Sequence, residues 1–331
     1  LTEWVHNSKL SFVKNDSYWN ADNVKLQHFD YLIMNDTTAQ LSSLENGSLD
    51  YLNVSDADYI DKFRENGELV EEPYSAARTV MVIFNCQDEI FQNQKIRQAF
   101  SLSIDRDSIS SVLNNGLTTP AYGLIPEQCS VGQLHYRDYA PEPLLALQEA
   151  NPDPKALLIE GMQELGLGDD PSALNVNLSI GGTNAKTKST GEFYQQMWQS
   201  VLGVTVELSF NDSATHTSNI TSGNFQMAMY NWGANVEPLF QLSRWSSASG
   251  GQSKWVNEEY QQLVSEASST EDDQTRLDLY AQAENLLITE AAIAPICYNG
   301  SLLFSYPYVH GPDNNPFDTV GMQKMYTIGR N

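Results

Sequence analysis

Residues 174–210, LNVNLSIGGTNAKTKSTGEFYQQMWQSVLGVTVELSF, contain two strand patterns separated by a helix pattern. Apolar and polar residues alternate at both ends of this stretch, as they do in strands that bury one face. Between these ends, Phe193, Met197 and Val201 recur every four residues, which predicts an amphipathic helix with these side chains facing the core. A strand–helix–strand unit of this length predicts two parallel strands joined by a right-handed crossover.

A third apolar run, FQMAMYNW at 225–232, predicts another strand, and the chain continues from its carboxyl end as GANVEP. Ligands of open α/β sheets bind beyond the carboxyl ends of the strands, so we expect a ligand near Trp232. The apolar runs RTVMVIFN (78–85) and AIAPICYN (292–299) predict a fully buried strand and a closing strand.

The stretch QKIRQAFSLSIDRDSISSVLNN (94–115) has a helical pattern whose phase slips at Asp105. Two carboxylates that flank an arginine, as Asp105 and Asp107 flank Arg106, suit a reaction centre. An aspartate at this point also accepts hydrogen bonds from the free N–H groups of a helix's first turn. We therefore interpret the three residues as a capped corner between two helices, with Arg106 reaching solvent or the nearby carboxylates.

The chain of 331 residues carries a net charge of −24, with 42 acidic and 18 basic residues. Such a chain repels phosphate backbones, which excludes nucleic-acid binding. It also repels an anionic membrane, unless an anchor outside this chain holds it there. The composition, 41% hydrophobic and 18% charged, is typical of a globular protein with a core.

Cysteine and histidine usage indicates neither a disulfide scaffold nor a metal site. With Cys86, Cys129 and Cys297, one bridge can form and at least one thiol stays free. The five histidines are scattered without ligand spacing, so we assign no metal and no cofactor. No run of about 18 apolar residues predicts a membrane span. The chain starts with LTEWVHNSKL, without methionine or a targeting signal, which does not resemble a natural start.

Several segments together resemble the family-5 extracellular solute-binding proteins, the dipeptide- and oligopeptide-binding proteins of ABC importers. The segment KIRQAFSLSIDRDSISSVLNNGLTTPAYGLIP (95–126) resembles their signature most densely. Five other segments agree in order: FVKNDSYWN (12–20), LENGSLDY (44–51), ALLIEGMQELGLG (156–168), GNFQMAMYNWGANVEP (223–238) and APICYNG (294–300). The resemblance covers essentially the whole chain, including the tail FDTVGMQKMYTIGRN, so we expect a natural C-terminus.

The resemblance implies an α/β, periplasmic-binding-protein-like (type II) fold with two lobes. Residues 1–77 would form part of lobe one, 78–300 nearly all of lobe two, and 301–331 a C-terminal return to lobe one. The family's N-terminal portion, about a domain in length, would precede this chain. Hinge strands would cross near 75–80 and 298–302.

The resemblance further implies a monomeric, non-catalytic protein outside the cytoplasm, either periplasmic or lipid-anchored at the cell surface. It would capture oligopeptides between closing lobes and deliver them to a membrane permease. An extended peptide has unpaired backbone groups that a strand-like cleft can satisfy without reading sequence. Water in roomy pockets then keeps specificity loose.

The candidate ligand-binding residues surround the expected strand end: Tyr230, Trp232, Gly233, Asn235, Glu237 and Tyr298. Trp232 suits a ligand wall as well as a core position, and Tyr298 suits a ligand contact as well as a sheet position. Asn235 stands where the family usually has the aspartate that pairs with a peptide's α-amino group, and Glu237 could replace that charge or be a solvated loop acid. Some relatives carry a basic residue just before the tryptophan, where this chain has Met229 and Tyr230.

Both departures weaken the expectation that free peptide termini are recognised. They favour a blocked or longer peptide, or a non-peptide ligand such as an oligosaccharide. A sensor that presents its ligand to a receptor would have the same fold. A secreted glycoside hydrolase is the alternative from another class, but it needs a carboxylate pair at strand ends, which the sequence does not offer.

Overall fold

The computed structural model of the chain describes residues 1–247, 251–311, 316–317 and 325–328. The predicted C-terminal return, residues 301–331, is therefore described only in part, and residues 312–315, 318–324 and 329–331 lie outside the described part of the chain. The chain divides into two compact units. Unit 1 comprises Leu1–Ala76 and Gly300–Asn331, and unit 2 comprises Ala77–Asn299.

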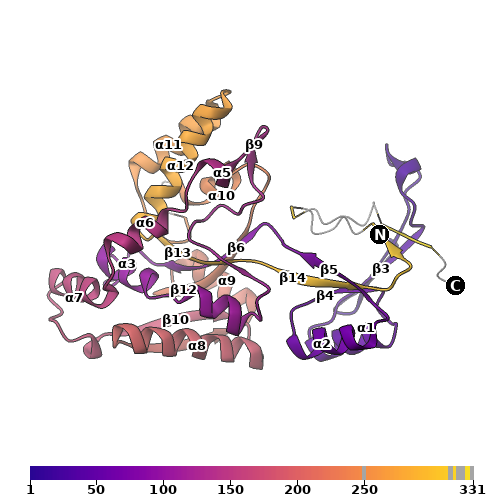
Figure 1. Cartoon of the computed structure of the whole chain (residues 1–331), viewed down its shortest axis with the longest axis horizontal. Coiled ribbons are helices and arrows are strands. Elements are labelled where there is room, and N and C mark those ends of the chain that lie inside the picture. The colour runs from indigo at the N-terminus through magenta and orange to yellow at the C-terminus, as the bar shows by residue number, and fades with distance from the viewer. Residues whose placement is uncertain (248–250, 312–315, 318–324, 329–331) are drawn as a thin grey trace. The chain divides into compact units, whose positions relative to one another are not determined.

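A six-stranded sheet forms the centre of unit 2 (Figure 1). In spatial order its strands are β11 (Thr205–Asn211), β10 (Asn175–Gly181), β12 (Met227–Gly233), β6 (Arg78–Phe84), β13 (Ile293–Tyr298) and β7 (Thr119–Pro120). β10 is parallel to both β11 and β12, whereas β6 is antiparallel to both β12 and β13. The predicted parallel pair is therefore confirmed, as are the predicted strands at 78–85, 225–232 and 292–299.

Helix α8 (Ala185–Leu202) connects β10 to β11 and ends at Gly203, whose φ of 80° suits a residue without Cβ. The predicted face of this helix is wrong by one residue. Its large buried side chains are Tyr194, Trp198 and Leu202, whereas Val201 is 41% exposed. Both sets have the same spacing, so periodicity alone could not choose between them.

The other helices of unit 2 pack around the sheet, with α3 against α7 and α11 beside α12 (Figure 1). They are α3 (Gln94–Leu102), α4 (Arg106–Ser108), α5 (Tyr136–Tyr139), α6 (Pro143–Ala150), α7 (Pro154–Glu164), α9 (Ser213–Ser222), α10 (Leu239–Leu242), α11 (Glu258–Ser269) and α12 (Asp273–Thr289). Short elements are η2 (Ile109–Leu113), η3 (Pro171–Ala173), η4 (Ser243–Trp245), β8 (Ser130–Val131) and β9 (Leu134–His135).

The predicted helix corner is confirmed, but the prediction for Arg106 is wrong. Asp105 caps α4, because its Oδ1 accepts the Ser108 N–H at 3.0 Å. Arg106 is only 2% exposed and reaches neither solvent nor a carboxylate. Its guanidinium donates to four backbone carbonyls, those of Ser101, Ile104, Ala121 and Pro295. It thus ties the end of α3 to the loop that follows β7 and to β13.

In the part that the structure describes, unit 1 contains three small sheets, two α-helices and one short helical turn. Its strands are β1 (Glu3–Val5), β2 (Lys9–Val13), β3 (His28–Leu32), β4 (Tyr51–Val54), β5 (Val70–Tyr74), β14 (Ser301–Ser305), β15 (Val309–His310) and β16 (Tyr326–Thr327). Its helices are α1 (Thr37–Glu45), α2 (Ala57–Asn66) and the short η1 (Ala21–Asn23). β14 lies between β4 and β5, and the Phe304 ring packs 5.3 Å from that of Phe63 on α2. β14 therefore packs with α2 in the core of unit 1.

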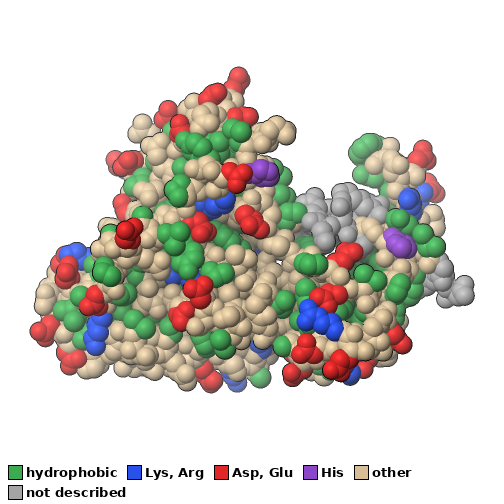
Figure 2. Space-filling model, viewed as in Figure 1, with side chains coloured by type: hydrophobic (Ala, Val, Ile, Leu, Met, Phe, Trp, Pro, Cys, Tyr) green, Lys and Arg blue, Asp and Glu red, His purple; other side chains and the backbone are tan. Residues whose placement is uncertain are grey.

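Acidic side chains are dispersed over the visible face of each unit, with few basic ones among them (Figure 2). This distribution agrees with the excess of carboxylates in the sequence. Among the helices that the structure describes, none combines the length and the apolar character needed to cross a bilayer.

Candidate functional site

The site is built on the carboxyl end of β12. Side chains alternate along a strand, so Tyr230 and Trp232 lie on one face of the sheet. Their rings stack with centroids 6.2 Å apart and an interplanar angle of 8°. The Phe240 ring on α10 stacks on Trp232 at 5.9 Å, and Trp245 meets Tyr230 edge-on at 6.3 Å. These contacts make a row of aromatic rings along the strand end.

Arg244, in η4, completes this row. Its Cζ lies 4.3 Å from the centre of the Trp232 ring, which is cation–π geometry. Its Nη2 donates to the Tyr230 hydroxyl at 3.2 Å. We call Tyr230, Trp232, Phe240, Arg244 and Trp245 together the Arg244 cluster.

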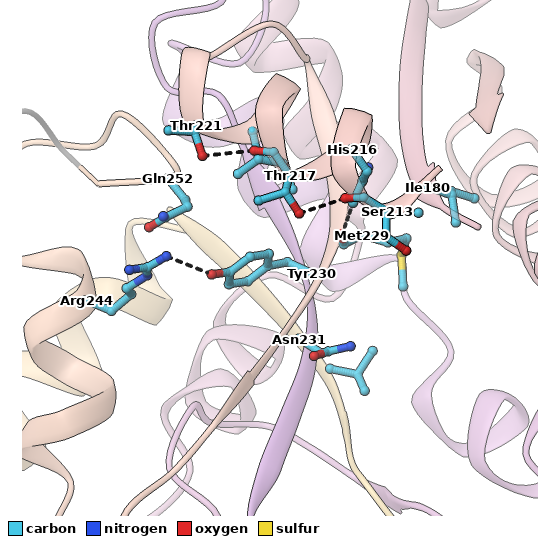
Figure 3. A pocket seen from close by; sticks show the side chains of 13 residues that line it. Ile180, Ser213, His216, Thr217, Thr221, Met229, Tyr230, Asn231, Arg244 and Gln252 are labelled. Carbon is cyan, nitrogen blue, oxygen red and sulfur yellow. Dashed lines mark hydrogen bonds between the residues drawn. The ribbon is translucent and has the colours of Figure 1, made fainter. Parts of the chain in front are cut away.

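A pocket of about 450 Å³ opens beside the cluster, at the carboxyl ends of β10 and β12 and along α9 (Figure 3). Thirteen residues line it: Val80, Ile180, Gly181, Ser213, His216, Thr217, Ile220, Thr221, Met229, Tyr230, Asn231, Arg244 and Gln252. Among the described residues, the lining contains no aspartate or glutamate, and Arg244 is its only lysine or arginine. Figure 3 shows Arg244 and Gln252 on one side and the polar side chains of α9 on another. The pocket can therefore bind a polar ligand, with a cation at one wall.

His216 fixes α9 against the strand ends that form the pocket. One ring nitrogen lies 2.9 Å from the Met229 carbonyl on β12, and the other lies 3.1 Å from the Ser179 hydroxyl on β10. Since a carbonyl only accepts, Nε2 carries a proton, and in the neutral imidazole Nδ1 then accepts from Ser179. Asn211 on β11 donates in turn to the same hydroxyl at 3.3 Å. This chain of hydrogen bonds positions one wall of the pocket.

A second, more open groove of about 650 Å³ lies between α10 and α11, on the other side of Phe240. Asn235 and Glu237 line this groove. Asn235 is exposed, and its backbone carbonyl accepts a hydrogen bond from the Cys129 thiol at 3.4 Å. Glu237 is not a free loop acid, because its Oε1 pairs with Arg276 at 2.7 Å and accepts from the Tyr280 hydroxyl at 3.0 Å.

Tyr298 lies in a buried environment away from the pocket and the groove, although it sits at the same level of the sheet as Trp232. Both residues lie opposite Thr79 of β6, on its two neighbouring strands. The Tyr298 side chain is buried, and its hydroxyl lies 2.8 Å from Glu142 and 3.2 Å from each of the Gly123 and Ile125 carbonyls. Burial raises its pKa well above the ordinary value. The structure thus favours the sheet position for Tyr298 over a ligand contact.

Three of the six candidates line the pocket or the groove, and Trp232 lines neither but stacks on rings that do. Tyr230 lines the pocket, Trp232 stacks between Tyr230 and Phe240, and Asn235 and Glu237 line the groove. Gly233 ends β12 opposite Arg78 and lines neither hollow.

Sequence reasoning missed Arg244 and His216. Neither lies in a motif, and Arg244 follows the strand by eleven residues on a short helical turn. The one available signal for Arg244 was its rarity, as one of 18 basic residues in a strongly acidic chain.

The described residues contain no cluster of three or more metal-ligating side chains. The three cysteines are unpaired in the structure. Burial raises the thiol pKa of Cys86 and Cys297 to about 11 and that of Cys129 to about 12. Thiols of this kind are not activated nucleophiles.

Known proteins resemble the chain over nearly all of its length. It is 27% identical to the oligopeptide-binding protein OppA of Bacillus subtilis over 90% of the chain and 54% of that relative. It is also 27% identical to the probable deoxycholate-binding periplasmic protein YgiS of Escherichia coli, over 98% of the chain and 59% of that relative. The chain therefore spans little more than half the length of the curated relatives it matches.

The solved structure of the murein tripeptide binding protein MppA of Escherichia coli matches with a TM-score of 0.82 and 25% identity, over 99% of this chain and 63% of that one. This match confirms the predicted fold class, of which the chain forms a part. The family model described as bacterial extracellular solute-binding proteins, family 5 Middle, matches residues 1–253. The chain therefore belongs to the bacterial extracellular solute-binding proteins of family 5.

Proposed function

We propose that the chain is the ligand-binding part of an extracytoplasmic receptor of an ABC importer, and that it captures peptides without catalysis. Unit 2 would be the second lobe and unit 1 part of the first. The observation that carries the proposal is the pocket beside the row of aromatic rings, at the carboxyl ends of parallel strands. A site of this kind suits an elongated polar ligand. Aromatic rings can pack against such a ligand, and hydroxyl and amide groups can hydrogen-bond to its backbone.

The relatives support peptides as the ligand class, since OppA is named as an oligopeptide-binding protein and MppA as a murein tripeptide binding protein. Within this site we propose Tyr230 and Trp232 as walls for the ligand, and Asn235 as a hydrogen-bonding group at the groove end. Gly233 would let the ligand backbone approach the strand end. Glu237 would act only if a ligand amine displaced Arg276 from its carboxylate, and Tyr298 would support the fold.

A non-peptide ligand is the second candidate. YgiS, which is 27% identical to the chain as OppA is, is named as a probable deoxycholate-binding protein, so membership of the family does not fix the ligand class. A hydrolase is disfavoured by the site itself, since the lining of the pocket contains no carboxylate to act as acid or nucleophile.

Native mass spectrometry of the full-length protein as purified would test the proposal. We expect a ladder of bound masses spaced like amino-acid residues, which collapses to one protein mass after denaturation. A single bound mass without amino-acid content, such as a bile acid or a sugar, would instead support the second candidate.

For cellular partners, we propose a membrane permease and a location outside the cytoplasm, with any anchor outside this chain. We expect the full-length protein to be monomeric. Size-exclusion chromatography with light scattering would test this expectation, and a stable dimer would contradict it.

A further inference from the structure

Arg244 is a cation without a counter-charge. Among the other arginines of unit 2, Arg137 pairs with Glu284 at 2.5 Å and Arg276 with Glu237 at 2.7 Å. The remaining three have neutral partners: Arg97 and Arg106 donate to backbone carbonyls, and Arg78 donates to the Asn231 side chain. Arg244 forms no ion pair with any described residue, and among those residues the one hydrogen-bond partner of its side chain is the Tyr230 hydroxyl. In a chain with 42 acidic residues, a carboxylate partner would have been easy to supply.

Hydrogen-bond donors around Arg244 also lack partners. Arg244 Nε, Trp232 Nε1 and Trp245 Nε1 are all shielded from solvent, and none has an acceptor in the structure. A buried donor without an acceptor costs about 1–3 kcal/mol, so native proteins rarely leave several in one place. Because these three donors are shielded, the part of the cluster that a ligand in the pocket can meet is the edge of the Arg244 guanidinium that lines it.

The surroundings strengthen the attraction of this cation for an anion. The Trp232 ring covers one face of its guanidinium and Nε is shielded, so water reaches only part of the charge. A partly desolvated charge interacts more strongly with an opposite charge than a fully hydrated one does. The lining of the pocket adds no carboxylate that would compete for it.

We propose that Arg244 binds a carboxylate of the ligand, and that Trp232 and Tyr230 hold its guanidinium in place for this contact. The inference rests on the proposed function and narrows it to anionic ligands. Where some relatives have a basic residue just before the tryptophan, this chain has Met229. The anion-binding group of this chain would instead be Arg244, on η4 after the strand. The carboxylate can be the C-terminus of a peptide or an acidic group elsewhere in the ligand, since a guanidinium binds both in the same two-bond geometry.

Isothermal titration calorimetry on the full-length protein distinguishes these sources. The probes are tetra-alanine with a free C-terminus, tetra-alanine amide, Ala-Ala-Glu-Ala amide, and deoxycholate as a carboxylate without peptide bonds. The variants are Arg244→Gln and Arg244→Lys. Lys188→Gln, at an exposed position of α8 that does not line the pocket, makes the same change in net charge.

We expect Arg244→Gln to weaken binding of a carboxylate-bearing probe by about 10- to 100-fold, as the loss of a charged hydrogen bond does. Arg244→Lys should restore part of the affinity, and Lys188→Gln should leave it unchanged. Added salt should weaken binding to the unaltered protein but not to Arg244→Gln, an effect that a purely structural role would not produce. Thermal unfolding of each variant checks that it is folded.

The outcomes separate this inference from the proposed function. If the free and amidated tetra-alanines bind equally to the unaltered protein and to Arg244→Gln, the carboxylate role is overturned and peptide capture stands. If only deoxycholate binds, and does so through Arg244, peptide capture is overturned and the carboxylate role stands. If no probe binds the unaltered protein, both are overturned.

Discussion

Unit 2 contains two clusters of arginine and tyrosine side chains that differ in one respect. In the first, which we call the Glu284 network, Tyr136, Arg137, Glu142, Glu284 and Tyr298 satisfy one another's polar groups. In the second, the Arg244 cluster, a similar set of side chains leaves a charge unpaired and three donors without acceptors. The contrast suggests that the first cluster serves the fold and that the second is completed by a ligand.

The Glu284 network shows how completely a buried charge can be satisfied. Glu284 is 1% exposed and accepts from the backbone N–H groups of Leu124 and Ile125 at 2.7 and 2.9 Å. It also accepts from the Tyr136 hydroxyl and from Arg137, each at 2.9 Å. These contacts fix the loop before α5 to α12. They also satisfy the Glu284 carboxylate, so the network does not need a ligand to complete its hydrogen bonds.

The largest effect is expected where the Glu284 network loses its charge. Glu284→Gln leaves the Arg137 guanidinium buried without its counter-ion, so we expect a loss of about 3–5 kcal/mol in the free energy of unfolding. Denaturant titration measures it. Glu237→Gln, at a carboxylate that solvent partly screens, is the matched control and should cost less than about 1 kcal/mol. Equal losses would remove the distinction between the two clusters.

We expect helix α8, which connects the parallel strands β10 and β11, to contribute to the stability of the fold and not to ligand binding. Trp198 is fully buried against Phe100, whose carbonyl accepts the indole N–H at 3.0 Å. Trp198→Ala should therefore destabilise the protein by about 3–5 kcal/mol. Val201→Ala, on the exposed side of α8, should change stability by no more than about 0.5 kcal/mol. A larger loss from Val201→Ala than from Trp198→Ala would restore the helix face predicted from the sequence.

Removing one tyrosine hydroxyl from each cluster sharpens the comparison. Tyr298→Phe leaves partners of a buried hydroxyl unsatisfied, so it should cost about 1–3 kcal/mol of stability with ligand affinity little changed. Tyr230→Phe should instead weaken ligand binding with little change in stability, because it removes the hydroxyl to which the Arg244 side chain donates. Chemical unfolding and ligand titration on the same two variants give both readouts. Parallel losses of stability and affinity in both variants would contradict the assignment.

The smallest effect concerns Cys129, which contacts the Asn235 carbonyl at the groove end. Burial raises its pKa to about 12, above the 9.0 of an exposed thiol. The folded state therefore holds the proton longer than the unfolded state does. The contribution is fully present below pH 9.0 and is lost as the pH rises towards about 12. Alkylation at pH 8 should be slow in the native protein and fast in denaturant, and fast native alkylation would show that this region opens.

Local patterns in the sequence were enough for the elements but not for the site. Alternation placed β10 and β11, and an aspartate at a phase slip marked the α4 cap, because both signals depend on neighbouring residues. The same signals failed for Arg106, whose four acceptors come from three separate segments. They also failed for α8, where two faces had equal spacing.

By itself, the sequence determined the parallel pair, the strand that ends at Trp232 and the resemblance to a family. Hydrophobic period and motif order are properties of the chain before it folds. Only the tertiary structure decided which charges are satisfied, because partners such as Arg137 and Glu284 are 147 residues apart. It also brought Arg244 from a segment without a motif onto the Trp232 ring. A pocket's chemistry depends on which groups remain unpaired, and that is fixed only when distant segments meet.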